Sequence, residues 1–584
     1  MEGVLNNVDV LIQIYRKLDL DDQIRLSQAS ANLKNVFESF IFSREDYSTL
    51  AVSASQGYFA VTNGCSHRRL LLQHHELMEF IRCHQLMVET FLQRNGTILD
   101  VRPFRNLTSL SYSNCIISRK HLKLFASLPL EKLDIVSCTN EFGRDIMLGS
   151  TWNVEYLIPM RKLRLLKVHS VSDYRRKLIS FREFDRMITR TTLEGVWLRC
   201  SILSERPFGN GMNAKSPDTT VALKHLDIGF RIRQNNSLLP YMRHFVNLVT
   251  LTISVEDQPI TEKILLEIVR MCVNLKVLHF KSSSFDNIQD FVVPSKLTEF
   301  SVTSCYAFNA DNLRQILNLA QLKKFHMTET LTGDVEDNFA ISSSIEHLYV
   351  DGDFWDSNIE LAFGGGENLK HLSWLVSGFV DNATANGAAL KRCTNLEELN
   401  LKLSNLPTKP LLELNSLHKL TITLGTASVP WLHIEEILKH PNLTELTLDG
   451  HFDYDDPPMD MHAPTAGFII GVGLLKISFQ IFKVALDFWL DLLSQNIQLQ
   501  LIVSDVEPDE EIVEFVRILI SHEKFPSDLR TLVMFDSHIK CRDLRHHLES
   551  TMQRLRRDVD HIEYYPNQES IFVIKFDRNL EQVK

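Results

Sequence analysis

The sequence predicts an α/β solenoid, in which short parallel strands and helices alternate along most of the chain. The main observation is an apolar phrase of the form Leu-x-x-Leu-x-Leu, with other large apolar residues at some places, that recurs from Leu107 to Met534. Within each phrase the second and third apolar residues alternate with polar ones, which is the period of a half-buried strand. Between phrases the apolar spacing changes to that of a helix, as in residues 264–272 and 313–320. Each repeat is therefore expected to be strand, turn, helix and turn, with Thr261 and Asp311 capping two of the helices.

The period of the phrase identifies the kind of repeat. Successive phrases mostly begin about 21 to 33 residues apart, which is the range of leucine-rich repeats. A lone repeat cannot bury its apolar face, so neighbours stack with their strands in a parallel ladder at a spacing of about 4.8 Å. The wider helices lie outside and force the ladder to curve, which makes the opposite face concave. Such an array indicates a binding protein.

The repeats divide the chain into four segments. We expect a small helical head over residues 1–45 and a helical linker and N-terminal cap over residues 46–105. The repeat array then occupies residues 106–540, and residues 541–584 form a C-terminal helix and strand cap. The linker prediction depends on the helical spacing of apolar residues between Leu77 and Leu92.

Composition and charge limit the kinds of partner. The hydrophobic content of 44% and the charged content of 23% are ordinary for a soluble globular protein. A net charge of -11 argues against nucleic acid as a partner, because neutralising phosphates requires clustered Lys and Arg. The start of the chain has no basic and apolar signal, and charged residues interrupt the longest apolar passage, 467–493. We therefore expect neither a secretory signal nor a membrane anchor.

The cysteines favour a reducing compartment. Their number, nine, is odd, and Cys115, Cys138 and Cys305 each follow the third apolar residue of a phrase by three positions. Leucine-rich repeats place a buried Asn or Cys at that position. The pattern predicts buried, reduced thiols in a cytoplasmic or nuclear protein.

Residues that alternate with the apolar pair of each strand are expected to form three columns on the concave face. Most of them are small and polar, but two groups are large or charged. The first group, on the third and fourth phrases, comprises Leu165, Lys167, His169, Trp197 and Arg199. The second group, on the seventh to eleventh phrases, comprises His279, Lys281, Lys324, His326, His347, Tyr349 and His371. Exposed Trp and Arg dominate binding energy at interfaces, so both groups are candidate sites for a substrate protein. The alternative interpretation is a solvated sheet face with scattered large residues.

No motif predicts catalysis, a cofactor or a metal. The His and Cys residues of 67–84 and of 541–547 lack the paired spacing of a structural zinc site. The acidic loop 449–464 lacks the Gly and terminal Glu of a helix-loop-helix calcium site. Neither a nucleophile elbow nor a phosphate-binding glycine loop is present. We expect a protein that is not an enzyme.

The head of the chain resembles an F-box. Periodicity over residues 5–40 indicates two or three short amphipathic helices separated at residues 19–22. The resemblance depends on Leu5, Val10, Ile14, Leu18, the Leu18-Asp19-x-x-Asp22 turn, Ile24, Leu26 and the run Ser27 to Ser30. The copy is diverged, because Asn6, Gln23 and Leu33 replace residues that the family usually has as Pro, Leu and Trp.

An F-box-like head followed by leucine-rich repeats is similar to the F-box/leucine-rich-repeat family, whose members are substrate receptors of SCF-type ubiquitin ligases. The resemblance implies a Skp-family adaptor and, through it, a cullin as partners, with an unknown substrate protein on the concave face. It also implies that certain apolar residues divide between the core of the head and a groove on the adaptor, namely Leu5, Val8, Leu11, Ile14, Leu18, Ile24 and Leu26. One alternative is a cytosolic leucine-rich-repeat scaffold without a ubiquitin role, whose head is a helical cap on the array. A second, an extracellular receptor domain, is disfavoured by the missing signal and the odd number of cysteines.

Overall fold

We describe the protein from a computed structural model, which divides into two compact units. Unit 1 comprises Met1–Ser284 and Val292–Lys296, and unit 2 comprises Phe285–Phe291 and Leu297–Lys584. The structure describes residues 8–17, 26, 29–30, 33, 36, 47–55, 58–63, 70–142, 154–169, 178–203, 221–231, 245–256, 258–286, 288–306, 308–328, 339–352, 361–363, 366–376, 390–403, 408–424, 431–450, 459–461, 474, 476–480, 482–484, 500–504, 531–535, 559–565 and 571–576.

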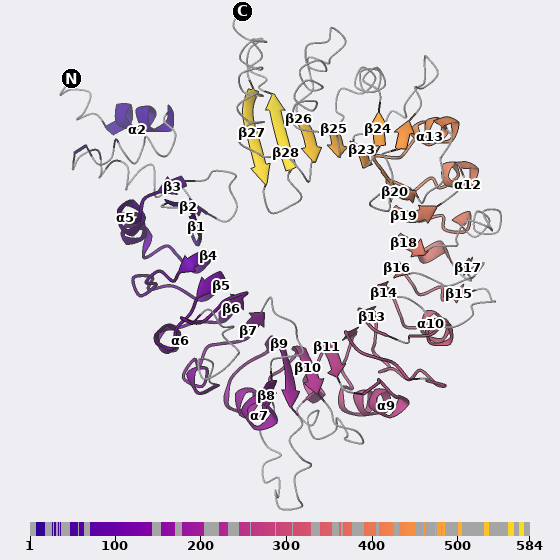
Figure 1. Cartoon of the computed structure of the whole chain (residues 1–584), viewed down its shortest axis with the longest axis horizontal. Helices are drawn as coiled ribbons and strands as arrows, with labels where there is room; N and C mark the ends of the chain where they lie inside the picture. Colours follow the sequence, from indigo (N-terminus) through magenta and orange to yellow (C-terminus); the bar gives the residue numbers. More distant parts are fainter. Residues whose placement is uncertain are drawn as a thin grey trace, which may run out of the picture. The chain divides into compact units, whose positions relative to one another are not determined.

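Unit 1 alternates strands and helices along the chain (Figure 1). Its elements are α2 (Val8–Lys17), β1 (Thr49–Ser55), β2 (Tyr58–Thr62), β3 (Leu70–Leu72), α5 (His74–His84), β4 (Thr90–Thr97), β5 (Ser109–Ile116), α6 (Arg119–Phe125), β6 (Lys132–Val136), the 3-10 helix η3 (Val154–Tyr156), β7 (Leu165–His169), β8 (Leu178–Ser180), α7 (Phe181–Arg190), β9 (Gly195–Leu203), β10 (His225–Arg231), the 3-10 helix η5 (Phe245–Asn247), β11 (Thr250–Glu256), α9 (Glu262–Met271) and β12 (Val277–Lys281).

Unit 2 continues the same alternation. Its elements are β13 (Glu299–Thr303), α10 (Ala310–Leu317), β14 (Lys324–Thr328), β15 (Phe339–Ile341), β16 (His347–Gly352), β17 (Leu361–Phe363), the 3-10 helix η6 (Gly366–Asn368), β18 (His371–Val376), β19 (Glu398–Leu403), α12 (Thr408–Leu412), β20 (Lys419–Leu424), α13 (Trp431–Leu438), β21 (Glu445–Gly450), β22 (Met459–Met461), β23 (Lys476–Gln480), β24 (Phe482–Val484), β25 (Gln500–Ser504), β26 (Thr531–Phe535), β27 (Val559–Tyr565) and β28 (Ile571–Phe576).

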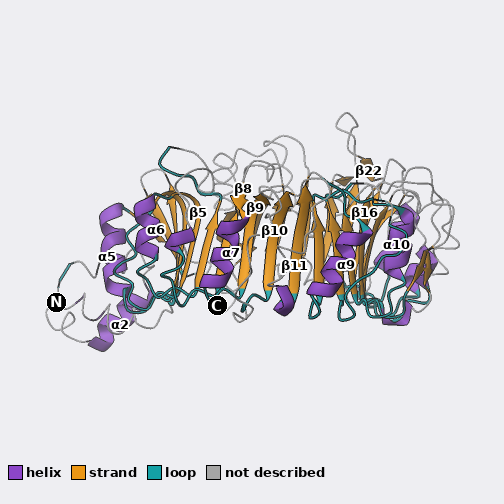
Figure 2. Cartoon of the chain, turned by 90° about the horizontal axis from the view of Figure 1, so that it is seen from below, coloured by secondary structure: helices purple, strands orange, loops and turns teal. Residues whose placement is uncertain are grey.

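The strands of each unit form a parallel ladder in which equivalent residues of successive phrases lie side by side. In unit 1, Leu110 pairs with Leu133, which pairs in turn with Leu166 on the next strand. In unit 2, Leu372 pairs with Leu399, which pairs with Leu420. All of these leucines are buried. Figure 2 shows the strands standing side by side with helices along one face, and we call the opposite face the concave face. The prediction of an α/β array of stacked strand and helix repeats is confirmed.

Buried phrase residues supply the core of both units. Where the structure describes their burial, the apolar pair of a strand and the leading leucine of its phrase are almost fully buried, as are the inward helix residues such as Ile268 and Ile316. Burying one such side chain stabilises the fold by roughly 1.5 to 3 kcal/mol, which favours the stacked state over separate repeats.

Helix starts follow the sequence closely, with one difference. The Thr261 hydroxyl accepts a hydrogen bond from the backbone N–H of Ile264 and caps α9, as predicted. The cap of α10 is Asn309, whose side chain accepts from the N–H of Asn312 at 2.8 Å, so the prediction of Asp311 was wrong. Asp311 lies in the first turn and forms an ion pair with Arg314 at 2.6 Å. An acidic residue there is favourable beside the helix N-terminus, which explains why the pattern was ambiguous.

Residues 46–105 differ from the helical linker predicted for them. Only α5 is helical by the expected pattern of Leu77, Phe80 and Ile81, and most of the remaining described segment is strand. β1 pairs with β2 and β2 with β3 in antiparallel fashion, whereas β1 and β4 are parallel and β4 continues into the ladder through β5. Buried and more exposed residues alternate along β1 and β4, which is the two-residue period of a strand. The helical spacing of the apolar residues in α5 dominated this part of the sequence and hid that period.

Asparagine side chains join each repeat to the one before it. Wherever Asn precedes the first leucine of a phrase, its Nδ2 donates to a backbone carbonyl oxygen of the preceding repeat. The pairs are Asn106 with Leu86, Asn247 with Val221, Asn274 with Val246, Asn368 with Ser343, Asn395 with Glu367 and Asn442 with Asn415, at 2.6 to 3.2 Å. These hydrogen bonds satisfy carbonyls that lie beyond the strand ladder.

A residue with left-handed backbone recurs near the C-terminal end of several strands. Asn114, Ser137 and Ser304 have φ values of 55°, 54° and 51°, in the left-handed region that Asn tolerates better than most residues. The residue that follows each of them is a cysteine, and Cys115, Cys138, Cys272, Cys305 and Cys393 are buried thiols. Burial at these positions is as predicted.

The C-terminal segment 541–584 contains β27 and β28, which pair with each other in antiparallel fashion. β28 also pairs in antiparallel fashion with β26, which is the parallel neighbour of β25. The helix predicted in this segment lies outside the described residues. So does most of the acidic loop 449–464.

Candidate functional site

The register of unit 2 places side chains of successive strands in columns on the concave face. The first column runs through Glu299, Lys324, His347, His371, Glu398 and Lys419. The second column runs through Ser301, His326, Tyr349, Ser373, Asn400 and Thr421. Members of one column lie about 4.8 Å apart, the spacing of paired strands, so that large neighbours are forced into contact.

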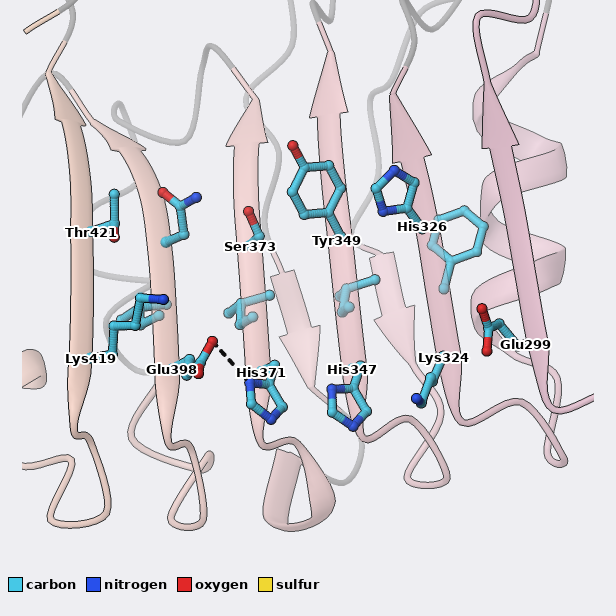
Figure 3. A pocket seen from close by; sticks show the side chains of 15 residues that line it. Glu299, Lys324, His326, His347, Tyr349, His371, Ser373, Glu398, Lys419 and Thr421 are labelled. Atoms are coloured by element: carbon cyan, nitrogen blue, oxygen red, sulfur yellow. Dashed lines mark ion pairs between the residues drawn. The ribbon is translucent and has the colours of Figure 1, made fainter. Parts of the chain in front are cut away.

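A groove of about 460 Å³ lies over these two columns (Figure 3). Its floor consists of the buried Phe325, Leu348, Leu372 and Leu399. Most of its walls come from β14, β16, β18, β19 and β20, and Glu299 extends it to β13. We call this cavity the unit 2 groove.

Two pairs of rings stack across neighbouring strands inside the groove. The rings of His326 and Tyr349 have centroids 4.3 Å apart and an interplanar angle of 7°. Those of His347 and His371 are 4.3 Å apart at 9°. Figure 3 shows the two rings of each pair beside one another on neighbouring strands. The groove therefore offers rigid ring surfaces, which cost little conformational entropy when a partner packs against them.

The electrostatics of the two stacked histidines differ. His371 Nδ1 lies 3.2 Å from Glu398 Oε2, drawn as a dashed line in Figure 3. The pKa of His347 is lowered from its ordinary value by burial first, then by the positive charges of His371, Lys324 and Lys370, against the opposing influence of Glu346. His347 is therefore mostly neutral near pH 7.

Polar atoms of the second column are partly sequestered. The Tyr349 hydroxyl donates to Asp351 Oδ2 at 3.3 Å, and burial, followed by that carboxylate, raises the pKa of Tyr349. Ser373 Oγ and Asn400 Oδ1 are buried and have no hydrogen-bond partner among the described residues. Such atoms are costly to leave unsatisfied, so a group that reached them on slight rearrangement would gain stabilisation.

Unit 1 displays the first predicted group differently. A Cβ on Gly195 would lie 2.5 Å from the indole ring of Trp197 and 2.9 Å from Leu165 Cδ2, so the ring lies flat over the glycine. The other side of this patch is His225, whose ring stacks on Trp197 at 6.1 Å and 11°. Trp197 is therefore half-buried in a flat apolar patch and does not project from the strand.

The other residues of that group lie nearby in the ladder. Lys167 and His169 are half-buried on β7, and Lys167 pairs with Trp197 in register. Between β9 and β10 the register shifts after Trp197, where Asp227 pairs with it and Gly229 pairs with Ser201. Arg199 falls inside this shift, and its side chain lies outside the described residues.

The second predicted group is only partly brought together. Lys324, His326, His347, Tyr349 and His371 all line the unit 2 groove, whereas His279 and Lys281 belong to β12 of unit 1. Lys281 Nζ lies 3.3 Å from Asp227 Oδ2.

Sequence reasoning missed the other polar residues of the groove, which are Glu299, Ser373, Glu398, Asn400, Lys419 and Thr421. They occupy the same two places of the phrase as the predicted residues, so aligning all phrases by column would have found them. Five of them are small, uncharged or acidic, and Lys419 belongs to a phrase beyond the seventh to eleventh, from which the second group was drawn.

Taken together, the phrase, its register and the buried positions define the architecture. Each unit is a leucine-rich-repeat array. No protein-family model matches the chain, and no curated protein matches it. Solved structures with some similarity include an internalin from Listeria monocytogenes, at 13% identity and a TM-score of 0.28 over 66% of this chain and 86% of that one.

Two further solved structures have a similarity of the same order. One is CroV588, described as a circular leucine-rich-repeat protein, at 12% identity and a TM-score of 0.31 over 73% of this chain and 54% of that one. The other is the Toll–Spatzle complex of Drosophila, at 13% identity and a TM-score of 0.28 over 85% of this chain and 60% of that one. The chain thus spans less than two thirds of both. The repeat assignment depends on the chain's own strand ladder.

The described residues offer neither a metal site nor a membrane-spanning helix. No group of three or more His, Cys, Asp or Glu among them is arranged to hold a metal ion. No helix in the same part of the chain has the length and apolar content to span a membrane.

The head is described only in part. In α2, Leu11 is 1% exposed, whereas Val8 and Val10 are each 37% exposed. Ile14 and Leu26 are half-buried. Leu5, Leu18 and Ile24, the other predicted adaptor contacts, lie outside the described residues.

Proposed function

We propose that this protein is a non-catalytic binding scaffold that holds a segment of a partner protein in the unit 2 groove. The observation that carries the proposal is the pair of ring stacks, His326 with Tyr349 and His347 with His371, set between charged side chains on a regular strand face. Tyrosine is one of the residue types that dominate binding energy at protein interfaces, and Tyr349 lies in one of the two stacks.

A protein segment fits the groove better than a small molecule does. The volume of about 460 Å³ lies within the range of small-molecule pockets. However, the groove is spread over neighbouring strands of an open face, whereas small-molecule sites usually enclose most of their ligand. An extended polypeptide crossing successive strands would meet one side chain of each column in turn.

The test is a comparison of two alanine variants by affinity purification and quantitative mass spectrometry. His326→Ala with Tyr349→Ala removes one ring stack from the groove, and Tyr306→Ala removes an exposed tyrosine of unit 2 outside it. A partner lost by the groove variant and kept by the control supports the proposal. A partner set unchanged by both variants contradicts it.

As the finer role, we propose a substrate receptor of an SCF-type ubiquitin ligase, with the head on a Skp-family adaptor and a cullin recruited through it. That role would place the protein in the cytoplasm or the nucleus. Support comes from the order of parts, an F-box-like head before leucine-rich repeats, and from α2, which buries Leu11 and leaves Val8 and Val10 partly exposed. A helix that divides its apolar residues in this way can pack on its own domain and on a partner.

The adaptor surface can be tested without disturbing the buried side of α2. Val8→Glu with Val10→Glu places charges on exposed positions, and Gln13→Glu places one on another exposed position of the same helix. We expect the double variant to lose the Skp-family adaptor and the cullin, and the control to keep both. If the intact chain and a version lacking residues 1–45 recover neither protein, the head is a helical cap and the chain is a scaffold without a ubiquitin role.

A further inference from the structure

The first column of the unit 2 groove carries a local excess of positive charge around His347. Lys324 on β14 and His371 on β18 are its register partners on the two sides. Lys324 is exposed and forms no ion pair with a described residue. His371 already has a carboxylate, Glu398, at 3.2 Å.

Two carboxylates near His347, those of Glu346 and Asp351, already have partners within the chain. Glu346, adjacent in sequence, has its Oε1 2.8 Å from Lys323 Nζ, and its pKa is lowered chiefly by that hydrogen bond. On the neighbouring strand, Lys370 adds a further positive charge. Two residues beyond Tyr349 on β16, Asp351 Oδ2 accepts a hydrogen bond from the Tyr349 hydroxyl at 3.3 Å. His347 thus lies between Lys324 and His371, and the groove carboxylates Glu299 and Glu398 lie one strand further away on either side.

We propose that an anionic oxygen group of an acidic peptide segment, a carboxylate or a phosphoryl group, binds at His347 between Lys324 and His371, and that a proton is taken up on His347 as it binds. The inference rests on the proposed function and names the chemistry of the segment that the groove accepts. The bound anion gives His347 a negatively charged partner, as Glu398 does for His371.

The direction of the pH dependence follows from the charges. In the free protein, burial and the neighbouring cations hold the pKa of His347 below its ordinary value of 6.5. A bound anion favours the imidazolium form and raises that pKa, so binding takes up a proton at pH values between the two. Affinity is therefore greatest at low pH and falls as pH rises through the pKa of the complex.

The charge pattern selects a peptide over a nucleic acid. Glu299 and Glu398 lie in the same column on either side of the cationic stretch. A continuous polyanion would meet these carboxylates, and the chain as a whole carries a net charge of -11. An anionic group on an otherwise neutral or mixed segment meets only Lys324 and the two histidines.

The experiment measures binding of a fluorescein-labelled peptide with one glutamate flanked by glycines to the full chain by anisotropy, from pH 5.5 to 8 at constant ionic strength. A second arm uses a glycine-flanked phosphoserine peptide, which distinguishes a carboxylate site from a phosphoryl site. We expect Kd for at least one peptide to increase by up to about tenfold per pH unit, the limit for uptake of a single proton.

Three variants identify the group responsible. His347→Asn keeps a polar side chain without the proton and is expected to weaken binding at pH 5.5 by at least tenfold and to flatten the profile. His347→Lys supplies a fixed charge and should retain binding at pH 5.5 while flattening the profile, which a merely structural role of the ring would not produce. His418→Asn, at an exposed histidine of unit 2 outside the groove, is the control and should match the wild type.

Two results overturn the inference. One is a pH profile for His347→Asn that matches the wild type, and the other is binding of neither peptide at any pH. Failure of the proposed function is separate, because it is judged by loss of a partner from the His326→Ala and Tyr349→Ala variant. If that variant loses a partner but neither peptide binds the wild-type chain, the anion site is refuted and the proposed function is supported.

Discussion

The asparagine that precedes a phrase offers a sharp test of how neighbouring repeats are joined. Asn395 Nδ2 donates to the backbone carbonyl oxygen of Glu367 at 2.6 Å. A hydrogen bond between neutral groups contributes about 0.5 to 1.5 kcal/mol net. Because this one lies at the surface, where water can replace the lost donor, we expect Asn395→Ala to lower the free energy of unfolding by about 1 kcal/mol.

Replacing the amide by a carboxylate separates this hydrogen bond from simple loss of contact. Asn395→Asp places an acceptor oxygen where the Nδ2 donor faces the carbonyl, so we expect it to destabilise by at least as much as Asn395→Ala at pH 7. Urea unfolding followed by circular dichroism measures both, with a midpoint shift of about 0.3 M per kcal/mol if the m-value is about 3 kcal/mol/M. Thr394→Ala, at the exposed neighbouring position, should change stability by less than about 0.5 kcal/mol. An Asp variant as stable as the wild type would refute the reasoning.

Three further predictions concern unit 1. Gly195→Ala should displace the Trp197 ring, whose atoms lie 2.5 Å from the new Cβ, and destabilise by about 1 to 3 kcal/mol, as read by indole fluorescence and urea unfolding. If the first predicted group binds substrate, Trp197→Ala with Arg199→Ala should abolish capture of the substrate and leave adaptor binding intact. Equal capture of substrate by the wild type and this double variant excludes the group as the binding site. Burial lowers the pKa of His84 from 6.5 to about 4, so the protein should lose on the order of 3 kcal/mol as pH falls from 6.5 to 4, compared with His84→Phe in urea unfolding. Stability falls with falling pH because His84 binds a proton more tightly in the unfolded chain than in the folded one. Equal dependence of stability on pH in the wild type and in His84→Phe would contradict this prediction.

The repeat phrase predicted the strands and their register because burial of one face dictates both. A slip of one residue would turn Leu372 and Trp374, both almost fully buried, toward solvent, so the pattern admits a single register. The same alternation of apolar and polar residues predicted His347, Tyr349 and His371 to lie on the concave face.

The contacts within the columns were not predictable from the phrase. Periodicity assigns His326 and Tyr349 to a face, but their stacking at 4.3 Å depends on rotamers that the sequence pattern does not specify. The flat position of Trp197 depends on the missing side chain of Gly195 on the same strand. The F-box resemblance of the head stays a prediction, because it concerns binding to an adaptor protein. The register of the strands carries no information about that binding.

The most direct test of the central claim is site-specific photocrosslinking on the groove. A benzoylphenylalanine at Tyr349, inside the unit 2 groove, is compared with one at Tyr306, which is 62% exposed on the same unit outside the groove. Both chains are expressed in cells, irradiated and analysed by mass spectrometry. The account predicts a covalent adduct to a discrete partner protein from position 349 and none of that partner from position 306. Adducts from position 306 alone, or the same adducts from both positions, would contradict it.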